Sequence, residues 1–568
     1  MTENSPSIEK KAFFLAFGIL SLLMAIYTVG TLGLFVGIPI SAWQLPVAVL
    51  LTLTAGYLFT RPLLPRKTQL TLALLLLGIL LLSGILAGLI LDTSWDGQWY
   101  HLPAIVRLGE GWNPIREPFY PLTKYDQSSY IWIWHYTKFS WISSAVIYKC
   151  TGLLETGKLI NQLIAWATFF TAWHVLAFFV RGKGWRVLLA ALVALNPVLL
   201  AQLFTDYVDG IMGNMLILVL LLLLALELET PDYRRLLWFM LGSCIIMASN
   251  LKFTGIALSG VLIGVSALYW LFRRRPLKLM FQKAALLALF YLLAFFFYGF
   301  NPYITNYQAK GFPFYPVNDP KLYAVIMNSV PRLIKNKTNR VEKLGLSLLS
   351  ECNNDANDTQ FHWKYPFVVR KSEVLLFSTT DVRLSGLGPL FQLTLWLTLI
   401  LLGYSLAKYR GHQHFDLVLT AIICIVGTTL IFPESWWARY FPILYLLPLL
   451  MLLPGSDQPS MPILSRIIIL VLCVNFALIG GASFGAAIVK TRVIRNEMAS
   501  LKNKPVYIDF NGSYFQATRQ RLKEAGISFI ETDSLTGDIK ELHTLYKLEG
   551  FGPKYSLTAP TVTNDNKH

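Results

Sequence analysis

The chain has 568 residues, of which 55% are hydrophobic and 14% charged, and its mean hydropathy of +0.52 is too high for a water-soluble protein. Its formal net charge of +17 would suggest nucleic acid as the partner of a soluble protein, but the basic residues stand mostly in short connectors between apolar runs. We therefore expect no nucleic-acid partner and a chain that lies in a lipid bilayer, with its basic residues near the headgroups.

Apolar runs of roughly 20 residues predict an all-α polytopic membrane protein that crosses the bilayer about 13 times. The first run follows the charged stretch MTENSPSIEKK, but it is longer than the apolar part of a signal peptide and has no clear cleavage site after it. We expect it to be retained as the first helix. The expected spans cover residues 12–36, 43–60, 69–91, 159–180, 187–204, 208–228, 235–250, 254–272, 284–300, 388–407, 415–432, 439–454 and 463–487.

Lysine and arginine predict the side of the membrane that each connector occupies, because short cytoplasmic loops are enriched in both. The basic clusters that fall on one side are Lys10–Lys11, Arg61 with Arg66 and Lys67, Arg181 with Lys183 and Arg186, Arg234–Arg235, Arg273–Arg275 with Lys278, and Lys408 with Arg410. The N-terminus is therefore expected in the cytoplasm, in a membrane that we interpret as the bacterial plasma (inner) membrane. The opposite, extracytoplasmic side then receives the longest connectors.

Three regions follow from these spans. Residues 1–68 hold two N-terminal transmembrane helices, and residues 69–487 form the transmembrane core with large outer loops at 92–158 and 301–387. From residue 488 the composition changes, since KPVYIDF, SYFQATRQRLKEAG and ISFIETD predict a strand, an amphipathic helix and a strand. Residues 488–568 are thus expected to form a small α/β extracytoplasmic region with a disordered tail, TAPTVTNDNKH.

The most informative stretch is LDTSWDGQWYHLP, directly after the third expected span. It brings Asp92 and Asp96 to the membrane surface, followed by aromatic residues that suit an interfacial belt. Carboxylates here can simply serve the polar end of a helix, and this alternative is stronger for Asp92 than for Asp96. His101 is a further candidate because it follows Asp96 closely and an imidazole can exchange a proton near neutral pH.

A second acidic stretch, QLFTDYVDGIMGN, lies at the turn between two expected spans. Asp206 and Asp209 stand three residues apart, a spacing that would place both on one helix face and in one outer cavity. Ionisable groups at membrane depth are costly, which favours a functional role. The alternative is that these carboxylates complement the dipole at a helix N-terminus.

Four cations are expected on the same outer side. They are Lys252 in SNLKFTG, Lys310 in NPYITNYQAKGFPFYP, Arg383 in DVRLSGLGP and Arg439 in PESWWARYFP. Lysine and arginine at the mouth of a membrane cavity suit a phosphate or pyrophosphate, and arginine can bind two oxygens at once. Each cation alone could equally anchor a lipid headgroup. Together with the two acidic turns, they predict a site for an anion beside an acid.

This pattern resembles the GT-C glycosyltransferases, polytopic enzymes that take a sugar from a polyprenyl or dolichyl phosphate carrier. SWDGQWYHLP matches the acidic residue at the start of their first outer loop, and FTDYVDG matches a second acidic motif between later core spans. RLSGLGPLF and PESWWARYFPILYLLP are similar to segments of bacterial proteins placed in the same superfamily. The resemblance covers roughly residues 69–454 and points toward the protein mannosyltransferase and aminoarabinose transferase branches.

The resemblance implies a GT-C-like bundle that moves a sugar from a polyprenyl-phosphate-linked donor to a glycan, lipid or protein acceptor. Asp96 would then be the general base, supported by Asp206 and Asp209, or these two would bind a divalent metal such as Mg²⁺ or Mn²⁺. Lys252 and Arg439 would contact the phosphate. The chain departs from the family pattern in two ways. It has two extra N-terminal spans, and a glycine follows Asp96 where the mannosyltransferases have a second acidic residue. The branch of the superfamily and the identity of the acceptor therefore stay undecided.

Other functions remain compatible with the sequence. A transporter or flippase of lipid-linked glycans should carry broken spans and charges near the middle of the membrane, whereas the charges here gather at one rim. A polymerase or ligase of lipid-linked glycans would favour arginine and histidine over carboxylates. A non-catalytic assembly subunit that displays the C-terminal region would leave these residues pointing apart.

Overall fold

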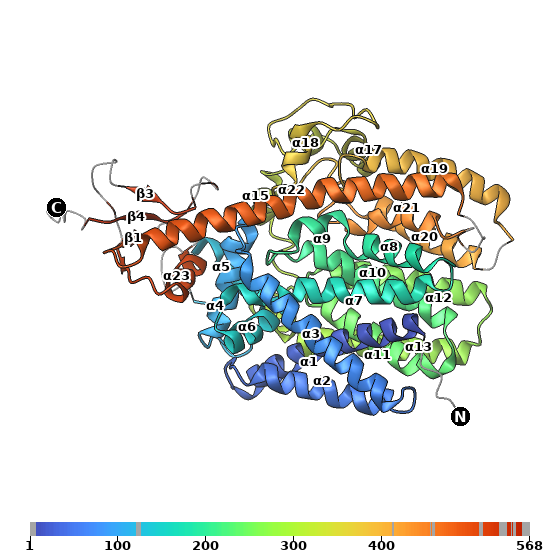
Figure 1. Ribbon diagram of the computed structural model, residues 1–568, viewed down its shortest axis with the longest axis horizontal. Helices are drawn as coiled ribbons and strands as arrows, with labels where there is room; N and C mark the ends of the chain where they lie inside the picture. Colours follow the sequence, from blue (N-terminus) through green and yellow to red (C-terminus); the bar gives the residue numbers. More distant parts are fainter. Residues whose placement is uncertain are drawn as a thin grey trace.

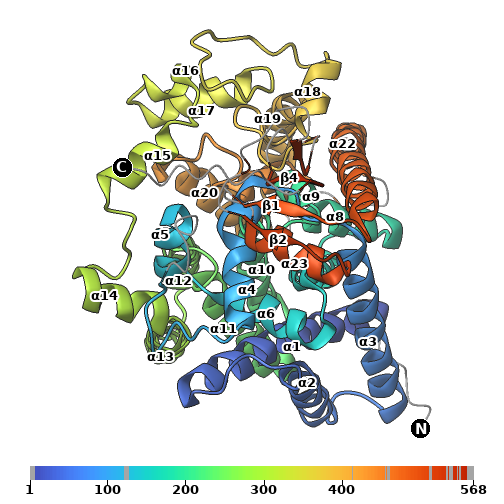
Figure 2. The same ribbon diagram turned by 90° about the vertical axis from the view of Figure 1, so that its left-hand side faces the viewer.

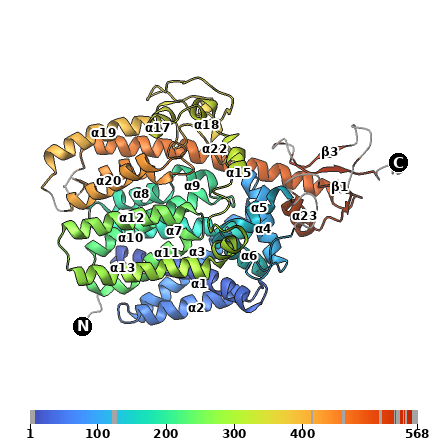
Figure 3. The same ribbon diagram turned by 180° about the vertical axis from the view of Figure 1, so that it is seen from behind.

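The computed structural model describes residues 7–120, 127–411, 414–454, 456, 461–510, 515–532, 535, 542–546, 548 and 552–558. Most helices lie side by side along the long axis of the molecule, and the C-terminal sheet lies beyond one end of this bundle (Figures 1 and 3). The tail expected to be disordered falls, from residue 559 onward, outside the described residues.

Eight helical segments among the described residues are long and apolar enough to cross a membrane. They are α1 (Ile8–Val36), α3 (Arg66–Leu89), η3 with α7 (Leu154–Lys158 and Leu159–Leu176), α10 (Asp209–Leu228), α12 (Thr254–Phe272), α13 with η5 (Leu277–Leu292 and Leu293–Tyr298), α19 (Phe391–Lys408) and α22 (Ile463–Leu501). The composition and length of these helices are those of a polytopic membrane protein.

The other five expected spans form shorter helices. They contain α2 (Gln44–Thr60), α8 and α9 (Lys183–Ala194 and Pro197–Gln202), α11 (Arg234–Ser249, which follows η4, Pro231–Tyr233), α20 (Phe415–Ile431), and η7 with α21 (Pro442–Tyr445 and Leu446–Met451). The break between α8 and α9 has a local cause, because Pro197 starts a new helix and the Asn196 side chain accepts hydrogen bonds from its first free amides. The number of about 13 spans therefore stays a prediction.

The helices differ in how much of their surface neighbouring helices cover. In α1 and α10, 83% and 89% of the most apolar 18-residue window is buried, against 22% in α3. An apolar surface all round a helix suits either a protein interior or lipid. We infer that α1, which packs against α7 and α2, belongs to the centre of the bundle, and that α3 faces the acyl chains.

The expected outer loops fold into short helices at one end of the bundle. The first contains η1 (Gly97–His101), α4 (Leu102–Gly109), α5 (Gln127–His135) and α6 (Phe139–Thr151). The second contains η6 (Phe300–Ile304), α14 (Thr305–Lys310), α15 (Pro320–Met327), α16 (Arg332–Lys335), α17 (Arg340–Leu349) and α18 (Lys371–Leu376). The described parts of both loops thus form helical structure that can build a cavity over the helix ends.

The C-terminal region contains the strand, helix and strand that the sequence predicts. β1 (Tyr507–Asp509) and β2 (Ile530–Glu531) pair in parallel across α23 (Phe515–Glu524), and β4 (Lys554–Ser556) pairs antiparallel with β1 and with β3 (His543–Thr544). The strand order is β2-β1-β4-β3. The helix before this region, α22, runs on to Leu501 instead of ending near residue 487, where the last span is expected to end.

Candidate functional site

A cavity of about 880 Å³ opens at the end of the bundle that carries the outer loops. Its walls come from distant parts of the chain, which are Asn354 and residues within 91–100, 132–136, 200–207, 252–254, 316–330, 377–383, 432–440 and 483–490. Most of its surface is apolar or aromatic, and its charged groups are few. This composition is typical of a ligand-binding pocket.

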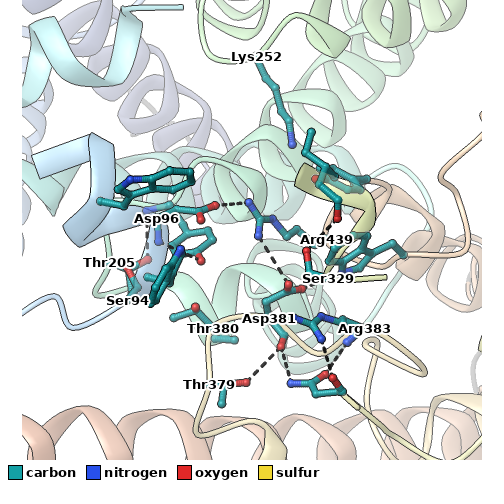
Figure 4. A pocket seen from close by; sticks show the side chains of 18 of the residues that line it. Ser94, Asp96, Thr205, Lys252, Ser329, Thr379, Thr380, Asp381, Arg383 and Arg439 are labelled. Carbon is teal, nitrogen blue, oxygen red and sulfur yellow. Dashed lines mark hydrogen bonds and ion pairs between the residues drawn. The ribbon is translucent and has the colours of Figure 1, made fainter. Parts of the chain in front are cut away.

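Arg439 is the centre of the charged cluster in this cavity. It lies between α20 and η7, and its guanidinium pairs with Asp96 through Nη2, with Asp209 through Nε at 2.6 Å and with Asp381 through Nη1 at 3.6 Å. Figure 4 shows Arg439 between Asp96 and Asp381. The five N–H donors of a planar guanidinium allow one side chain to hold three carboxylates. The guanidinium also lies 4.8 Å from the centre of the Tyr207 ring.

Lys252 completes the cluster from the turn between α11 and α12. Its Nζ lies 2.5 Å from Asp209 Oδ1 and 4.1 Å from the centre of the Tyr440 ring. Burial lowers the pKa of Lys252, and the opposing effect of Asp209 does not fully compensate. Since Arg439 holds Oδ2 of Asp209, both oxygens of this carboxylate are occupied by cations.

Arg383 lines the same cavity but contacts a different partner. Its backbone N–H donates to Asn354 Oδ1 at 2.8 Å, and its Nη1 donates to the Asn354 carbonyl at 2.6 Å. Its buried Nε meets no acceptor within the described part of the chain. A buried donor without a partner costs free energy, and Arg383 is one of the cations that line the cavity.

The structure separates the carboxylates of Asp206 and Asp209, and neither residue is among those that line the cavity, so the expectation that both face one cavity is wrong. The backbone N–H of Asp206 donates to Asp92 Oδ2 at 2.7 Å, beneath the cavity wall. Burial and the neighbouring Asp92 carboxylate raise the pKa of Asp206 well above its ordinary value. The i, i+3 rule fails here because α10 begins only at Asp209, so Asp206 is not on the same helix.

His101 and Lys310 also lie away from the cavity surface. His101, the last residue of η1, has a buried side chain whose Nδ1 accepts a hydrogen bond from Trp141 Nε1 at 2.7 Å, and burial lowers its pKa to about 3. Lys310 ends α14 with an exposed side chain, 5.2 Å from the centre of the Tyr315 ring. The geometry thus gives His101 a packing role, while Lys310 has no contact with the other expected site residues.

Several cavity residues were missed by sequence reasoning. Asp381 stands two residues before Arg383 and meets Arg439, but nothing in the sequence indicates this pairing. Trp437 donates from Nε1 to Asp381 Oδ1 at 2.8 Å, and Trp95 and Trp99 form part of the wall. These tryptophans suited an interfacial belt by sequence. The density of tryptophans around Trp95 and Trp99, directly after the third expected span, was the signal that could have assigned these two residues to a pocket.

The carboxylates of this site do not form a chelating set for a divalent metal. No group of three or more His, Cys, Asp and Glu side chains with suitable geometry occurs among the described residues. In the expected pair, the Asp206 carboxyl group lies beside Asp92, whereas the oxygens of Asp209 are held by the two cations Lys252 and Arg439. The pair therefore does not fit Mg²⁺ or Mn²⁺ in this arrangement.

Comparisons with protein-family models, with curated proteins and with solved structures gave no match. The chemistry of the site therefore rests on its own geometry. Four expected residues, Asp96, Lys252, Arg383 and Arg439, come from distant parts of the chain and line one cavity. Such a cavity can bind an anion through its cations and accept a proton at a carboxylate.

Proposed function

We propose that the protein is a membrane glycosyltransferase that moves a sugar from a polyprenyl-phosphate-linked donor to a glycan, lipid or protein acceptor. The observation that carries this proposal is the meeting of Asp96, Lys252, Arg383 and Arg439 on one cavity. In this proposal the basic connectors orient the chain in a bacterial plasma membrane, and the reaction takes place on the extracytoplasmic face.

The cavity walls suit a donor that is partly polar and partly apolar. On one side Trp95, Trp99 and Tyr100 supply aromatic surface near Asp96, and on another side α22 supplies Phe484 and Ala487. Because α22 also faces the surroundings of the bundle along much of its length, a lipid chain could reach the cavity beside this helix. The volume of about 880 Å³ is within the usual range of ligand pockets.

The cations of the site are paired before any substrate is present, and this pairing suggests how donor binding prepares the reaction. An incoming phosphate would compete with Asp96 for the guanidinium of Arg439, while Arg383 adds a further positive charge to the wall of the cavity. Once the phosphate has replaced Asp96 as the partner of Arg439, the Asp96 carboxylate is released. It is then free to accept a proton from the acceptor.

The proposed transfer inverts the configuration at the sugar. The acceptor hydroxyl gives its proton to Asp96, its oxygen bonds to the anomeric carbon, and the bond from that carbon to the phosphate oxygen breaks. The electron pair leaves with the lipid phosphate. Lys252 and Arg439 stabilise the negative charge that grows there. No step depends on a divalent metal, since the Asp206 and Asp209 carboxylates do not converge on one ion.

Substitution of Asp96 tests the proposal. In nanodiscs, with a radiolabelled polyprenyl-phosphate sugar and a panel of acceptors, we expect Asp96→Asn to lower kcat by about 10²- to 10⁴-fold, the usual contribution of a general base. Donor binding should stay the same or tighten, because an amide competes less for Arg439. Asp232→Asn, on an exposed turn before α11, is the matched control and should behave as the wild type.

The competing functions give different results in the same system. Undiminished transfer by Asp96→Asn would remove this carboxylate from the reaction. Movement of intact lipid-linked glycan across vesicles, without cleavage of the sugar–phosphate bond, would instead indicate a transporter. Transfer of a whole oligosaccharide from a lipid pyrophosphate would indicate a polymerase or ligase.

A further inference from the structure

A second arginine-centred cluster lies beneath the cavity, and its arginine comes from the C-terminal region. Arg521 on α23 is buried, with 3% of its side chain exposed. Its Nε donates to Glu155 Oε1 at 2.8 Å, its Nη2 donates to the carbonyl oxygen of Asp92 at 2.6 Å, and its Nη1 donates to Gln98 Oε1 at 3.1 Å. Arg521 therefore holds both ends of the segment that contains Asp96.

The same cluster reaches the second acidic turn through Asp92. The backbone N–H of Asp92 donates to Glu155 Oε2 at 2.9 Å, and the Asp92 carboxylate accepts from the backbone N–H of Ser94 at 2.8 Å and of Asp206 at 2.7 Å. Lys158 also pairs with Glu155. Arg521 thus contacts the turn that supplies Asp96 directly, through Asp92. It reaches the turn that supplies Asp209 in one further step, from Asp92 to Asp206.

Apolar packing ties the same segment to the C-terminal region. Leu91 belongs to one buried cluster with Met498 of α22, Ile508 of β1 and Leu522 of α23. Its backbone N–H donates to Thr491 Oγ1 at 2.9 Å. Figure 2, which looks onto this end, shows α23 and the sheet in front of α4, which α23 contacts.

The segment before η1 has little regular structure of its own. Residues 91–94 are in neither a helix nor a strand, and Asp96 directly precedes η1. The direction of the Asp96 side chain therefore depends on what holds residues 92 and 98 in place. Arg521 contacts both of them. The N–H groups of its planar guanidinium donate to several acceptors at once, which the single ammonium group of a lysine could not reach together.

We propose that Arg521 is a positioning residue of the cavity: the C-terminal α/β region holds the 92–98 segment so that Asp96 faces Arg439. The C-terminal region is then part of the scaffold of the site. The kinetic consequence rests on the proposed function, whereas the structural consequence does not.

The test compares variants of the full-length protein in nanodiscs. Arg521→Met removes the fork, Arg521→Lys keeps the charge with fewer contacts, and Arg519→Met on the same helix is the matched control, since Arg519 pairs with Glu531 inside the C-terminal region. Amide hydrogen exchange of residues 91–98 is measured without substrate. Exchange of α19, which lies outside the cluster, serves as the internal reference.

We expect Arg521→Met to speed amide exchange at residues 91–98 by at least about tenfold, with α19 unchanged. The kcat should fall by roughly tenfold or more with a small change in the donor KM, because misplacement of a reacting group lowers the rate more than it weakens binding. Arg521→Lys should restore part of both quantities, and Arg519→Met should alter neither.

Each other outcome has a definite meaning. Unchanged exchange at residues 91–98 in a folded Arg521→Met would overturn the proposal, as would faster exchange with undiminished kcat. If Arg521→Met does not fold, Arg521→Lys decides, because lysine still compensates the buried Glu155 charge. Loosened exchange in Arg521→Met, with no transfer by the wild type, would count against the proposed function alone and support the anchoring by Arg521.

Discussion

Two arginines from distant parts of the chain organise neighbouring clusters of carboxylates, yet the clusters differ in access. Arg439 has 15% of its side chain exposed and lies on the cavity, whereas Arg521 has 3% exposed and is sealed beneath it. A charged pair that a ligand can reach can exchange partners, while a sealed pair only fixes geometry. The Arg439 cluster is therefore suited to binding and reaction of a ligand, and the Arg521 cluster is suited to holding the backbone of the site in place.

The same two turns supply both clusters. Asp92 and Asp206 point to the sealed cluster, and Asp96 and Asp209 point to Arg439. Neighbouring acids in one motif thus have different partners, because each turn ends where a helix begins. An acidic motif does not reveal which of its members reaches the cavity.

The largest expected difference separates Asp209 from Asp206. Asp209→Asn leaves Lys252 and Arg439 without their shared buried carboxylate, which should cost about 3–5 kcal/mol of folding stability. Asp206→Asn should cost less than about 1 kcal/mol, because burial and the neighbouring Asp92 carboxylate raise the pKa of Asp206 and so disfavour its charged form, and an amide has nearly the same shape as the carboxyl group. The melting temperatures of the two variants in detergent, at pH 7, measure the contrast.

Equal losses in these two variants would show that the clusters do not differ as proposed. A large loss in Asp206→Asn alone would mean that the charged form of Asp206 is needed. Asp319→Asn, in the second outer loop, controls for the general effect of removing an outer carboxylate and should leave the melting temperature unchanged.

A smaller effect distinguishes Lys252 from Lys310, which the sequence treats alike. Lys252→Met should raise the donor KM by about 10- to 100-fold, the value of one hydrogen bond to a charged group, with a smaller change in kcat. Lys310→Met should change neither, since its exposed side chain lies away from the cavity. Steady-state transfer kinetics measure both, and equal KM values for the two variants would remove Lys252 from the donor site.

Much of the fold follows from the sequence because hydrophobic patterning is a local signal. Runs of apolar residues predict the helical membrane domain, and alternation in KPVYIDF and ISFIETD predicts the strands β1 and β2, which the structure contains. The count of spans is harder, since a single proline can divide a run, as Pro197 does between α8 and α9. Hydropathy also does not show that α22 continues to Leu501, beyond the expected end of this span at residue 487.

The site was less predictable than the fold, for reasons of distance along the chain. The side-chain type of Asp96, Lys252 and Arg439, together with their location at the outer ends of expected spans, was enough to predict them as site residues. All three line one cavity. The contact of Arg521 with Glu155 spans 366 positions in the sequence, and no local pattern carries such information. From the sequence alone, an arginine on an amphipathic helix is predicted to be exposed to solvent, and only the folded structure shows that Arg521 is buried against its partners.

The smallest expected effect concerns His101, which belongs to neither cluster. Its titration tests whether water is excluded from the space between η1 and Trp141. Its pKa is lowered to about 3 by burial, against an ordinary value of 6.5. Between these values the unfolded state binds a proton that the folded state does not, so stability is full above pH 6.5 and is lost as the pH falls toward 3. Asparagine at this position can still accept the hydrogen bond from Trp141 but does not titrate.

We therefore expect His101→Asn to gain about 1 kcal/mol relative to the wild type when the pH is lowered from 7.5 to 6. The difference between the melting temperatures of the two proteins, followed across this range in detergent, measures the effect. Their difference at pH 7.5 gives the constant cost of the substitution, since His101 is neutral in both states there. A difference that does not change with pH would mean that His101 takes up a proton in the folded protein as readily as in the unfolded protein, and that water reaches the space between η1 and Trp141.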